Sequence, residues 1–374
     1  MAMTPREQEI VLILKENPLI SQEDIAQKLK TSRSSVAVHL SNLMKKGIVV
    51  GRGYIVKDNP KVCVIGGINV DVKGHTLAEP VLYTSNPGQT VTTAGGVARN
   101  IAENLARFQV PTTLLSVVGQ DSLGERVLAE TRDAGVDITQ VEKMSGTTGT
   151  YTAILNQRGE LLVAVAAMEI IDLLTPSFLK RKEELILSST IIVCDTNLPA
   201  DTLRYLIAIT NDNGIPLVIE PVSSPKVEKL KNILQDKNQK IFLVTPNRAE
   251  AEVLAGISIE SDADFPVVAR QLHSLGIQNI LLTLGERGAL FSAMKDGSEL
   301  TMQLIPASKV NVKDVTGAGD AFVAGIIYGL MSSKSIEDCC LYGHAAASLT
   351  LISETTVNSD LSASMLEQAV EKLR

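Results

Sequence analysis

The stretch DVTGAGDAFVAG, residues 314–325, carries the most informative pattern in the chain. Gly317 and Gly319 lie just before an apolar run that has the composition of a buried helix. Because glycine lets the backbone turn sharply, successive N–H groups at such a turn can face one point, and the helix that follows adds the positive end of its dipole. The stretch therefore predicts a cradle for negative charge at a helix start, with Asp320 in the first turn.

A cradle of this kind suits phosphoryl transfer, because negative charge accumulates on the transferred group and its stabilisation usually dominates catalysis. Asp320 is placed where a carboxylate accepts a proton from an attacking hydroxyl. A bare Gly-Ala-Gly-Asp is more typical of an ordinary helix cap after a glycine-rich loop. The catalytic interpretation therefore depends on the rest of the chain.

Two other glycine pairs occur earlier, in GGINVDVKG (66–74) and AGGVARN (94–100). Gly95 and Gly96 enter a predicted helix, where they let a ligand approach the backbone, and Asn100 lies about one turn inside it. Asn69 and Asp71 alternate at the end of the first predicted strand and so point to one face. Open α/β sheets bind ligands at strand ends, where an amide and a carboxylate suit paired hydroxyls. A pair that only stabilises a turn is the alternative.

From residue 61 onward, short apolar runs alternate with amphipathic segments. This alternation predicts a mostly parallel sheet covered by helices on both faces. Two regions break it, 81–91 and 149–165, and both are predicted to be antiparallel strands of a small β lid over the strand ends. Neither GxxxxGK[ST] nor GxGxxG occurs, which disfavours a P-loop or a dinucleotide-binding site.

Taken together, AGGVARNIAENLARF (94–108) and DVTGAGDAFVAGIIYGL (314–330) resemble the two ends of the PfkB/ribokinase pattern of sugar and nucleoside kinases. The resemblance covers residues 61–374 and implies a ribokinase-like α/β/α sandwich with a small β lid, using ATP as the phosphoryl donor. It implies that Asp320 is the catalytic base and that Gly317, Ala318 and Gly319 form the anion hole. The residues that it implies in substrate binding are Asn69, Asp71, Lys73, Gly95, Gly96 and Asn100.

The same resemblance gives meaning to TPNRAE (245–250) and TLGERG (283–288), which otherwise look like ordinary strand-to-helix turns. Asn247 and Glu250 match a motif that orders Mg²⁺ and phosphate through water, in keeping with the waters that Mg²⁺ retains. The nucleotide-binding residues that it implies are Asn247, Thr283, Gly285 and Gly288. Asp314 and Thr316 resemble part of a monovalent-cation site, with K⁺ as the implied ion.

Three segments are similar to the pseudouridine kinase branch of the family: MEIIDLLTP (168–176), CDTNL (194–198) and VSSPK (222–226). We therefore expect a kinase that phosphorylates the ribose 5′-hydroxyl of pseudouridine. Ala166 and Ala167 depart from the branch, which tends to have Asn-Asp there, and the loss of two polar groups can change base preference. Another ribonucleoside (inosine, guanosine or cytidine) and a free sugar are the alternative substrates.

Residues 1–57 carry nine basic and five acidic side chains, a net charge of +4 in a chain whose total is −7. Cap signals at Thr4, Ser21 and Ser32 predict three helices, the third of which is expected to bury Val38 and Met44 with its other apolar residues. With a predicted hairpin around residues 48–56, this order is similar to a winged helix-turn-helix, followed by a linker at 58–60 and the kinase domain at 61–374. The residues expected to face DNA are Arg33, Ser34, Ser35, His39 and Arg52. A small dimerisation or regulatory domain is the alternative.

No apolar run approaches the ~18 residues that span a bilayer, and the first residues lack an apolar leader segment. We therefore expect a cytoplasmic protein with no membrane partner and with its four cysteines reduced. The family resemblance implies a homodimer formed through the β lid, whose exposed strands present an unpaired edge. A ligand-sensing transcriptional regulator, in which the kinase fold acts as the sensor, is the alternative from another class.

Overall fold

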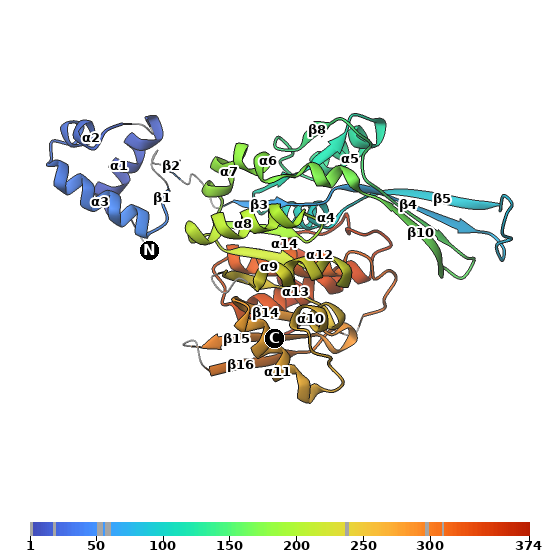
Figure 1. Ribbon diagram of the computed structural model, residues 1–374. Helices are drawn as coiled ribbons and strands as arrows, with labels where there is room; N and C mark the ends of the chain where they lie inside the picture. Colours follow the sequence, from blue (N-terminus) through green and yellow to red (C-terminus); the bar gives the residue numbers. More distant parts are fainter. Residues whose placement is uncertain are drawn as a thin grey trace. The chain divides into compact units, whose positions relative to one another are not determined.

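The computed structural model describes residues 3–17, 20–50, 55–56, 61–235, 239–295, 299–308 and 310–374 (Figure 1). Its contacts divide the chain into two compact units, residues 1–60 with 181–190 and residues 61–180 with 191–374. The linker expected at 58–60 and Arg52 of the expected wing lie outside the described residues. Within the described part of the chain, no helix is both long and apolar enough to cross a membrane.

The described residues between 3 and 56 form three helices and a short antiparallel strand pair. These elements are α1 (Pro5–Glu16), α2 (Gln22–Lys28), α3 (Arg33–Lys45), β1 (Val49–Val50) and β2 (Ile55–Val56). All three predicted caps are formed. Thr4 and Glu7 make a capping box, and the hydroxyls of Ser21 and Ser32 each accept the N–H group three residues further on. Since these side chains satisfy amides that lack a partner within the helix, they set where each helix begins.

The apolar core of these helices is formed by Ile10, Leu14, Ile25, Val36, Leu40 and Leu43. The expectation for Val38 and Met44 is wrong, because their exposed fractions are 59% and 45%. Positions 36, 40 and 43 of α3 lie on one stripe at three- and four-residue spacing, and residues 38 and 44 fall outside it. Val38 therefore belongs to the solvent-facing surface of the helix that is expected to read DNA.

The described part of the second unit is built on an eight-stranded sheet in the order β16-β15-β14-β13-β12-β11-β3-β6. The six strands β6, β3, β11, β12, β13 and β14 pair in parallel. Strands β15 and β16 are added at one edge and pair antiparallel. The strands are β3 (Val62–Ile65), β6 (Thr112–Leu115), β11 (Ile191–Asp195), β12 (Leu217–Glu220), β13 (Ile241–Val244), β14 (Ile277–Thr283), β15 (Ala289–Lys295) and β16 (Glu299–Ile305). Three of these strands, β3, β6 and β11, are fully buried along their length, as expected for a parallel sheet covered on both faces.

The direction of the crossover connections decides which face each helix covers. The chain leaves β3 toward β6 through α4, but it runs from β11 through β12 and β13 to β14 in the opposite direction along the sheet. Because parallel crossovers are right-handed, helix α4 and helices α8 to α11 cover opposite faces (Figure 1). The strand order reverses between β3 and β11, and open α/β sheets bind their ligands at such a reversal, beyond the carboxyl ends of the strands.

The helices of this part of the chain pack in two groups. Helix α12 contacts both α4 and α13, and α13 contacts α14, while α9 contacts α8 and α10. The helices are α4 (Val97–Arg107), α5 (Ser122–Asp133), α6 (Pro176–Arg181), α8 (Ala200–Asp212), α9 (Ser224–Leu234), α10 (Arg248–Ala255), α11 (Phe265–Ser274), α12 (Ala318–Met331), α13 (Ile336–Leu351) and α14 (Ala363–Glu371). Helix α7 (Glu183–Ser188) belongs to the other unit. All four cysteines are buried among these layers as free thiols.

A second, four-stranded sheet in the order β10-β9-β4-β5 forms the lid. Its strands are β4 (Asn69–Thr76), β5 (Gly88–Gly95), β9 (Thr150–Leu155) and β10 (Leu161–Ala167). The hairpin predicted at 149–165 corresponds to β9 and β10. Asn156 closes its turn, because its side-chain oxygen accepts the N–H groups of Arg158 and Glu160 at 2.9 and 3.0 Å.

Two details of the predicted lid differ from the structure. The strand expected at 81–91 runs instead from Gly88 to Gly95, because Asn86 binds the backbone of Val81 and holds residues 81–86 as a loop. Asn69 and Asp71 do not end the first strand. They begin β4, since the backbone breaks at Gly66, where φ is +152°. The polar pair therefore belongs to the lid sheet, at the point where it joins the central sheet.

Candidate active site

The turn before α12 has the conformation that its glycines predict. Gly317 is the N-terminal cap of α12 with φ +81°, and a Cβ atom there would collide with the carbonyl oxygen of Thr356. Gly319 has open space beside it. The N–H of Ala318 donates to the carbonyl of Val315 at 3.3 Å. The expected anion hole is therefore a helix start with room next to Gly319 and with Asp320 in its first turn.

Asp320 is a buried acid with an exposed fraction of 9%. Its Oδ2 accepts a hydrogen bond of 2.8 Å from the side-chain amide of Asn100. Burial raises the pKa of Asp320 to about 7, and the nearby carboxyl groups of Asp195 and Asp71 add to that rise, while the bond from Asn100 opposes it. A carboxyl group with a pKa near neutrality exchanges a proton readily at physiological pH, which is what a general base requires.

Asn100 is positioned by α4, whose start is held from a distant strand. Gly96 caps this helix with φ +103° and offers no side chain. Instead, Oδ2 of Asp195 accepts the N–H groups of Gly67 and Ala98 at 2.8 and 3.1 Å. Asp195 thus joins both glycine turns at the reversal point of the sheet, a role that the sequence analysis missed. Its signal was weak, since it is a single acid at the end of an apolar strand.

The residues expected to bind the sugar lie next to Asp320. The side-chain amide of Asn69 donates to Asp71 at 2.6 Å, and both lie on β4 opposite the end of β5. Gly95 is required there, because a Cβ atom would collide with the Asp71 carboxylate. Burial raises the pKa of Asp71, and its charge acts on Asp320. The structure therefore brings the expected hydroxyl-binding pair and the expected base to one place.

Lys73 points to a different partner. Its ammonium lies 3.3 Å from Oδ2 of Asp314, whose other oxygen accepts the N–H and hydroxyl of Thr316 at 2.8 and 2.7 Å. Burial alone would raise the pKa of Asp314, but these bonds and the Lys73 charge hold it below its usual range. Lys73 therefore ties the lid strand β4 to the loop that leads into α12.

A cavity of about 220 Å³ opens beside Asp320 and Gly319. Its other lining residues are Val97, Glu220, Val222, Thr245, Asn247, Glu250, Thr283 and Phe322. Asn247 and Glu250 form the capping box of α10, with bonds of 2.9 and 3.0 Å, which fixes both side chains at this wall. Of the expected nucleotide residues, Asn247 and Thr283 line the cavity, whereas Gly285 and Gly288 shape the turn between β14 and β15.

The family model for pfkB family carbohydrate kinases matches residues 59–363. The chain belongs to this family. It is therefore a phosphotransferase acting on a hydroxyl group of a sugar or nucleoside, as the sequence analysis expects. A second model, for winged helix-turn-helix DNA-binding domains, matches residues 3–50 of this pfkB kinase.

Similar proteins agree with this assignment. The uncharacterized sugar kinase YeiI of Escherichia coli K12 is 35% identical over 362 residues, covering 96% of this chain and 97% of that protein. The pseudouridine kinase of the same organism is 32% identical over 317 residues, covering 84% and 98%. The solved structure of Arabidopsis thaliana ribokinase with ribose and ATP, at 21% identity, has a TM-score of 0.71 over 84% of this chain and 99% of that chain. The expected ribokinase-like fold is thereby confirmed.

The cavity of the pfkB kinase suits a divalent cation. Glu220, Glu250 and Asp320 line it, and no lysine or arginine is among its described lining residues. Burial raises the pKa of both glutamates, and Thr245 donates a hydrogen bond to Glu220. Within the described part of the chain, no three acidic, His or Cys side chains are grouped to hold a metal by themselves. The side-chain oxygens of Asn247, Glu220 and Glu250 therefore fit an ion such as Mg²⁺ that keeps several waters or phosphate oxygens around it.

A second cavity, of about 430 Å³, lies between α13, α14 and the segment before residue 314. Its lining is largely apolar and includes Val310, Leu349, Ile352, Met365 and Ala369. No local sequence pattern marks this cavity, because its walls come from three separate elements.

The residues expected to face DNA belong to the first unit. Arg33 and Ser34 are exposed at the start of α3, while Ser35 and His39 are partly buried. The Nε of Arg33 lies 3.9 Å from Glu23, and both side chains are about 70% exposed, so that the ion pair is weak and the guanidinium stays available. Arg52 lies outside the described residues.

Proposed function

We propose that this kinase transfers the γ-phosphoryl group of ATP to the 5′-hydroxyl of a ribonucleoside and that pseudouridine is its substrate. The observation that carries the proposal is the buried Asp320, which accepts a hydrogen bond from the Asn100 amide and whose pKa burial raises to about 7, with the nearby Asp71 carboxyl group adding to that rise. The choice of pseudouridine is supported by the likeness to the Escherichia coli enzyme and by the three branch segments.

The chain's own residues supply three actions. Asn69 and Asp71 bind hydroxyl groups of the ribose and aim its 5′-oxygen at Asp320. Asp320 takes the proton as that oxygen bonds to the γ-phosphorus and the bond to the ADP oxygen breaks. The amides at residues 317–319 receive the charge on the transferred group. Asn247 and Glu250 would hold Mg²⁺ through water, and the ion would supply further positive charge to the phosphates.

Two contacts support a binding site for the nucleoside base under the lid. The sulfur of Met168 lies next to Gly149, and Ile171 lies next to Gly67, so that the segment after β10 reaches the sugar pair. We assign the base to this apolar wall. Ala166 and Ala167, which end β10, offer it no polar side chain.

The base of ATP is assigned to the second cavity. Val310 in the wall of that cavity lies a few residues before the anion-hole turn in the chain. Between them, the N–H of Lys313 donates to the carbonyl of Leu351 at the end of α13. Asn247, Thr283, Gly285 and Gly288 would then contact the phosphates and ribose of ATP. Ile352→Asp should raise the KM for ATP about tenfold or more, with little change in the KM for the nucleoside.

A monovalent cation is proposed beside Asp314 and Thr316, with K⁺ as the ion. Because the Lys73 ammonium already neutralises Asp314, we expect exchange of K⁺ for a large organic cation to change kcat only slightly. Lys73→Met should make the K⁺ dependence steeper.

The decisive experiment is a substrate panel with purified full-length protein. ADP release would be measured with pseudouridine, uridine, inosine, guanosine, cytidine and ribose, and the product identified by mass spectrometry. Pseudouridine should give the highest kcat/KM, and Asp320→Asn should slow ADP release from every substrate by about 100-fold or more. Preference for ribose over all nucleosides would contradict the proposed substrate class.

We propose a second role, DNA-binding regulation, which is supported by the winged helix-turn-helix and its net charge of +4. The full-length protein should bind its own upstream DNA, with a salt-dependent affinity. Arg33→Ala should weaken that binding without changing kinase activity. The variant Asp320→Asn separates the two roles, because it keeps a nucleoside site and lacks turnover. If nucleoside alters the DNA affinity of this variant, the kinase domain acts as a sensor.

A further inference from the structure

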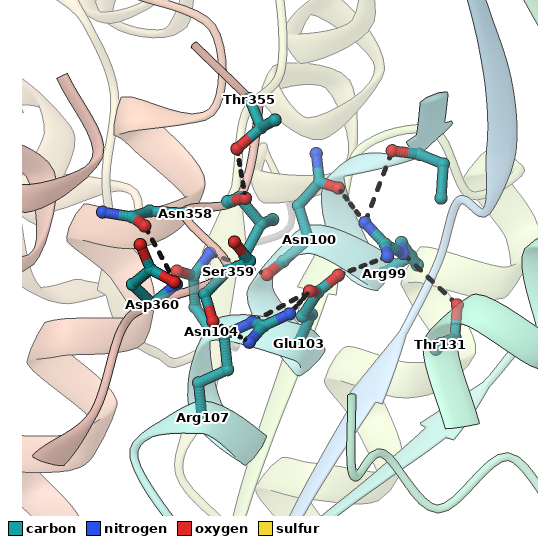
Figure 2. A network of polar contacts seen from close by, with 12 residues as sticks. Arg99, Asn100, Glu103, Asn104, Arg107, Thr131, Thr355, Asn358, Ser359 and Asp360 are labelled. Carbon is teal, nitrogen blue, oxygen red and sulfur yellow. Dashed lines mark hydrogen bonds and ion pairs between the residues drawn. The ribbon is translucent and has the colours of Figure 1, made fainter. Parts of the chain in front are cut away.

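Helix α4 carries charged side chains on its buried side. Arg99 and Glu103 have exposed fractions of 5% and 4%, although isolated charges at such depth are costly. Arg107 lies one turn further along the same side. Figure 2 shows these three side chains in a row, with Arg99 beside Asn100 and Thr131, and Arg107 beside the loop that contains Ser359. A buried row of charges that ends next to a catalytic group needs an explanation beyond packing.

The hydrogen bonds and the ion pair of Arg99 hold its guanidinium in one orientation. Its Nε donates to the hydroxyl of Thr131 at 3.3 Å, and that hydroxyl donates to the carbonyl of Val127 at 2.6 Å. Its Nη1 donates to the backbone carbonyl of Ala94 at 3.4 Å, and its Nη2 forms an ion pair with Glu103. The guanidinium is therefore fixed from β5, from α5 and from its own helix.

The remaining bond of Arg99 reaches Asn100. Nη1 of Arg99 lies 3.2 Å from Oδ1 of Asn100. A guanidinium has donors and no acceptor, so the atom of the amide that faces it must be the oxygen. The nitrogen of the same amide then faces Asp320, to which it donates at 2.8 Å. Without a donor on its far side, the amide could present either atom to the carboxylate.

We propose that Arg99 is a positioning residue, which fixes the Asn100 amide so that its N–H group, and not its oxygen, faces Asp320. The inference rests on the proposed role of Asp320 as the base. Arg99 acts through Asn100 and does not touch the reacting atoms. Its effect is to keep the ionised form of Asp320 accessible near neutral pH, because a donated hydrogen bond stabilises a carboxylate and an amide oxygen would repel it.

Other charges around the two groups come from every neighbouring element. The charged groups that act on Asp320 are Asp195 on β11, Asp71 on β4, Arg99 on α4 and Glu220 on β12. Those that act on Arg99 are Glu103 and Arg107 on α4, Glu130 on α5 and Asp71 on β4. Most of the charges near Asp320 are negative, so that the single donated bond from Asn100 has an outsized influence on its ionisation.

The test is the pH profile of kcat/KM for the full-length enzyme, whose acidic limb reports ionisation of the base in the free enzyme. In Arg99→Met the limb should move to higher pH by about one unit, the size expected for a lost hydrogen bond to a charged group. Arg107→Met is the matched control. It removes an equal charge that pairs with Glu103 at 2.9 Å and binds the Ser359 carbonyl rather than Asn100. Its limb should stay within about 0.2 units of wild type, and equal shifts in both variants would overturn the proposal.

A double-mutant cycle separates positioning from plain charge. In the Asn100→Ala background, Arg99→Met should cause only a small further shift, because the amide through which Arg99 acts is gone. A further shift as large as that in the wild-type background would mean that Arg99 acts by its field alone, and the proposal would be wrong.

Two further measurements cover failure of folding or of turnover. If circular dichroism shows Arg99→Met unfolded, Arg99→Lys replaces it. The single ammonium of the substituted lysine would pair with Glu103 and could not also hold Asn100. We therefore expect a smaller upward shift of the acidic limb, and an unmoved limb would refute the proposal.

If the wild type phosphorylates no substrate, the proposed function fails. The Asp320 ionisation is then titrated directly by infrared difference spectra against Asp320→Asn, and the same ordering of variants is expected.

Discussion

At the scale of single residues, Asp320 combines burial with the role proposed for it. Its pKa is raised from 3.8 to about 7, so that the native state binds this proton more tightly than the unfolded chain does. Stability is therefore greatest below the unfolded pKa and falls as the pH rises between these two values. The same desolvation that makes the carboxyl group a competent base at neutral pH thus works against the fold, a trade typical of functional sites.

The variant Asp320→Asn should show both sides of this trade. We expect kcat to fall by about 10²- to 10⁴-fold, because proton transfer from the hydroxyl loses its acceptor. Thermal denaturation at pH 8 should show a higher Tm than wild type, since no buried charge remains. Below pH 4 the difference should shrink, because wild-type Asp320 is then protonated.

The control is Asp360→Asn, a change at an exposed carboxylate in the loop just before α14. It should leave both kcat and Tm close to wild type. An Asp320→Asn protein that kept near-wild-type turnover while folded would contradict the catalytic assignment.

At the scale of elements, the start of α12 depends on two glycines for different reasons. Gly317 adopts φ +81° against the Thr356 carbonyl, whereas Gly319 lies in ordinary helix with open space beside it on the cavity wall. One glycine is needed for the path of the backbone and the other for room at the site.

Substitution of each glycine by alanine should separate these roles. Gly317→Ala should destabilise the kinase by about 1–3 kcal/mol, because a Cβ is strained at this φ and collides with the neighbouring loop. Gly319→Ala should keep the Tm of wild type but lower kcat/KM, since its methyl group occupies space proposed for the transferred phosphoryl group. Thermal denaturation and steady-state kinetics would measure the two effects, and equal Tm losses would refute the distinction.

At the scale of the whole molecule, the lid sheet has an exposed edge strand with apolar side chains. Leu161, Val163 and Val165 of edge strand β10 have exposed fractions of 56%, 54% and 61%. An exposed strand edge with apolar side chains pairs readily with another chain. We propose that the lids of two subunits pair to form the homodimer.

A double variant, Val163→Glu with Val165→Glu, should therefore weaken dimerisation by ~100-fold or more, because it places charge in the proposed interface. Light scattering over a concentration series would measure this. Gln89→Glu, at the exposed opposite edge strand β5, is the control and should leave the dimer intact. A wild-type protein that is monomeric at every concentration would contradict the proposal.

Much of the candidate site could be predicted from local patterns. Short sequence patterns of a few residues predict the glycine turns at 66–67, 95–96 and 317–319 and the capping pair Asn247–Glu250. The structure brings Asn69, Asp71 and Asn100 to Asp320 as the family resemblance implies. These features can be predicted from sequence because the backbone geometry of each depends on only a few neighbouring residues.

Other parts of the site had no local signal. Asp195 reaches amides 128 and 97 residues away, and Glu220 meets Asp320 only across the sheet. Lys73, expected at the substrate, pairs with Asp314, 241 residues further along the chain. Single charged residues at strand ends look alike in sequence, and only the order of the strands decides which of them meet.

The sequence by itself determined the two-part organisation, the strand–helix alternation, the caps and the glycine-dependent turns, because these follow from backbone preferences and periodic burial over short windows. Tertiary structure alone decided that β4 belongs to the lid, that Asp195 holds two glycine turns, and that Arg99 faces the oxygen of Asn100. Those outcomes depend on distances between residues far apart in the chain. Such distances are fixed only when the direction of the crossovers sets the order of the strands.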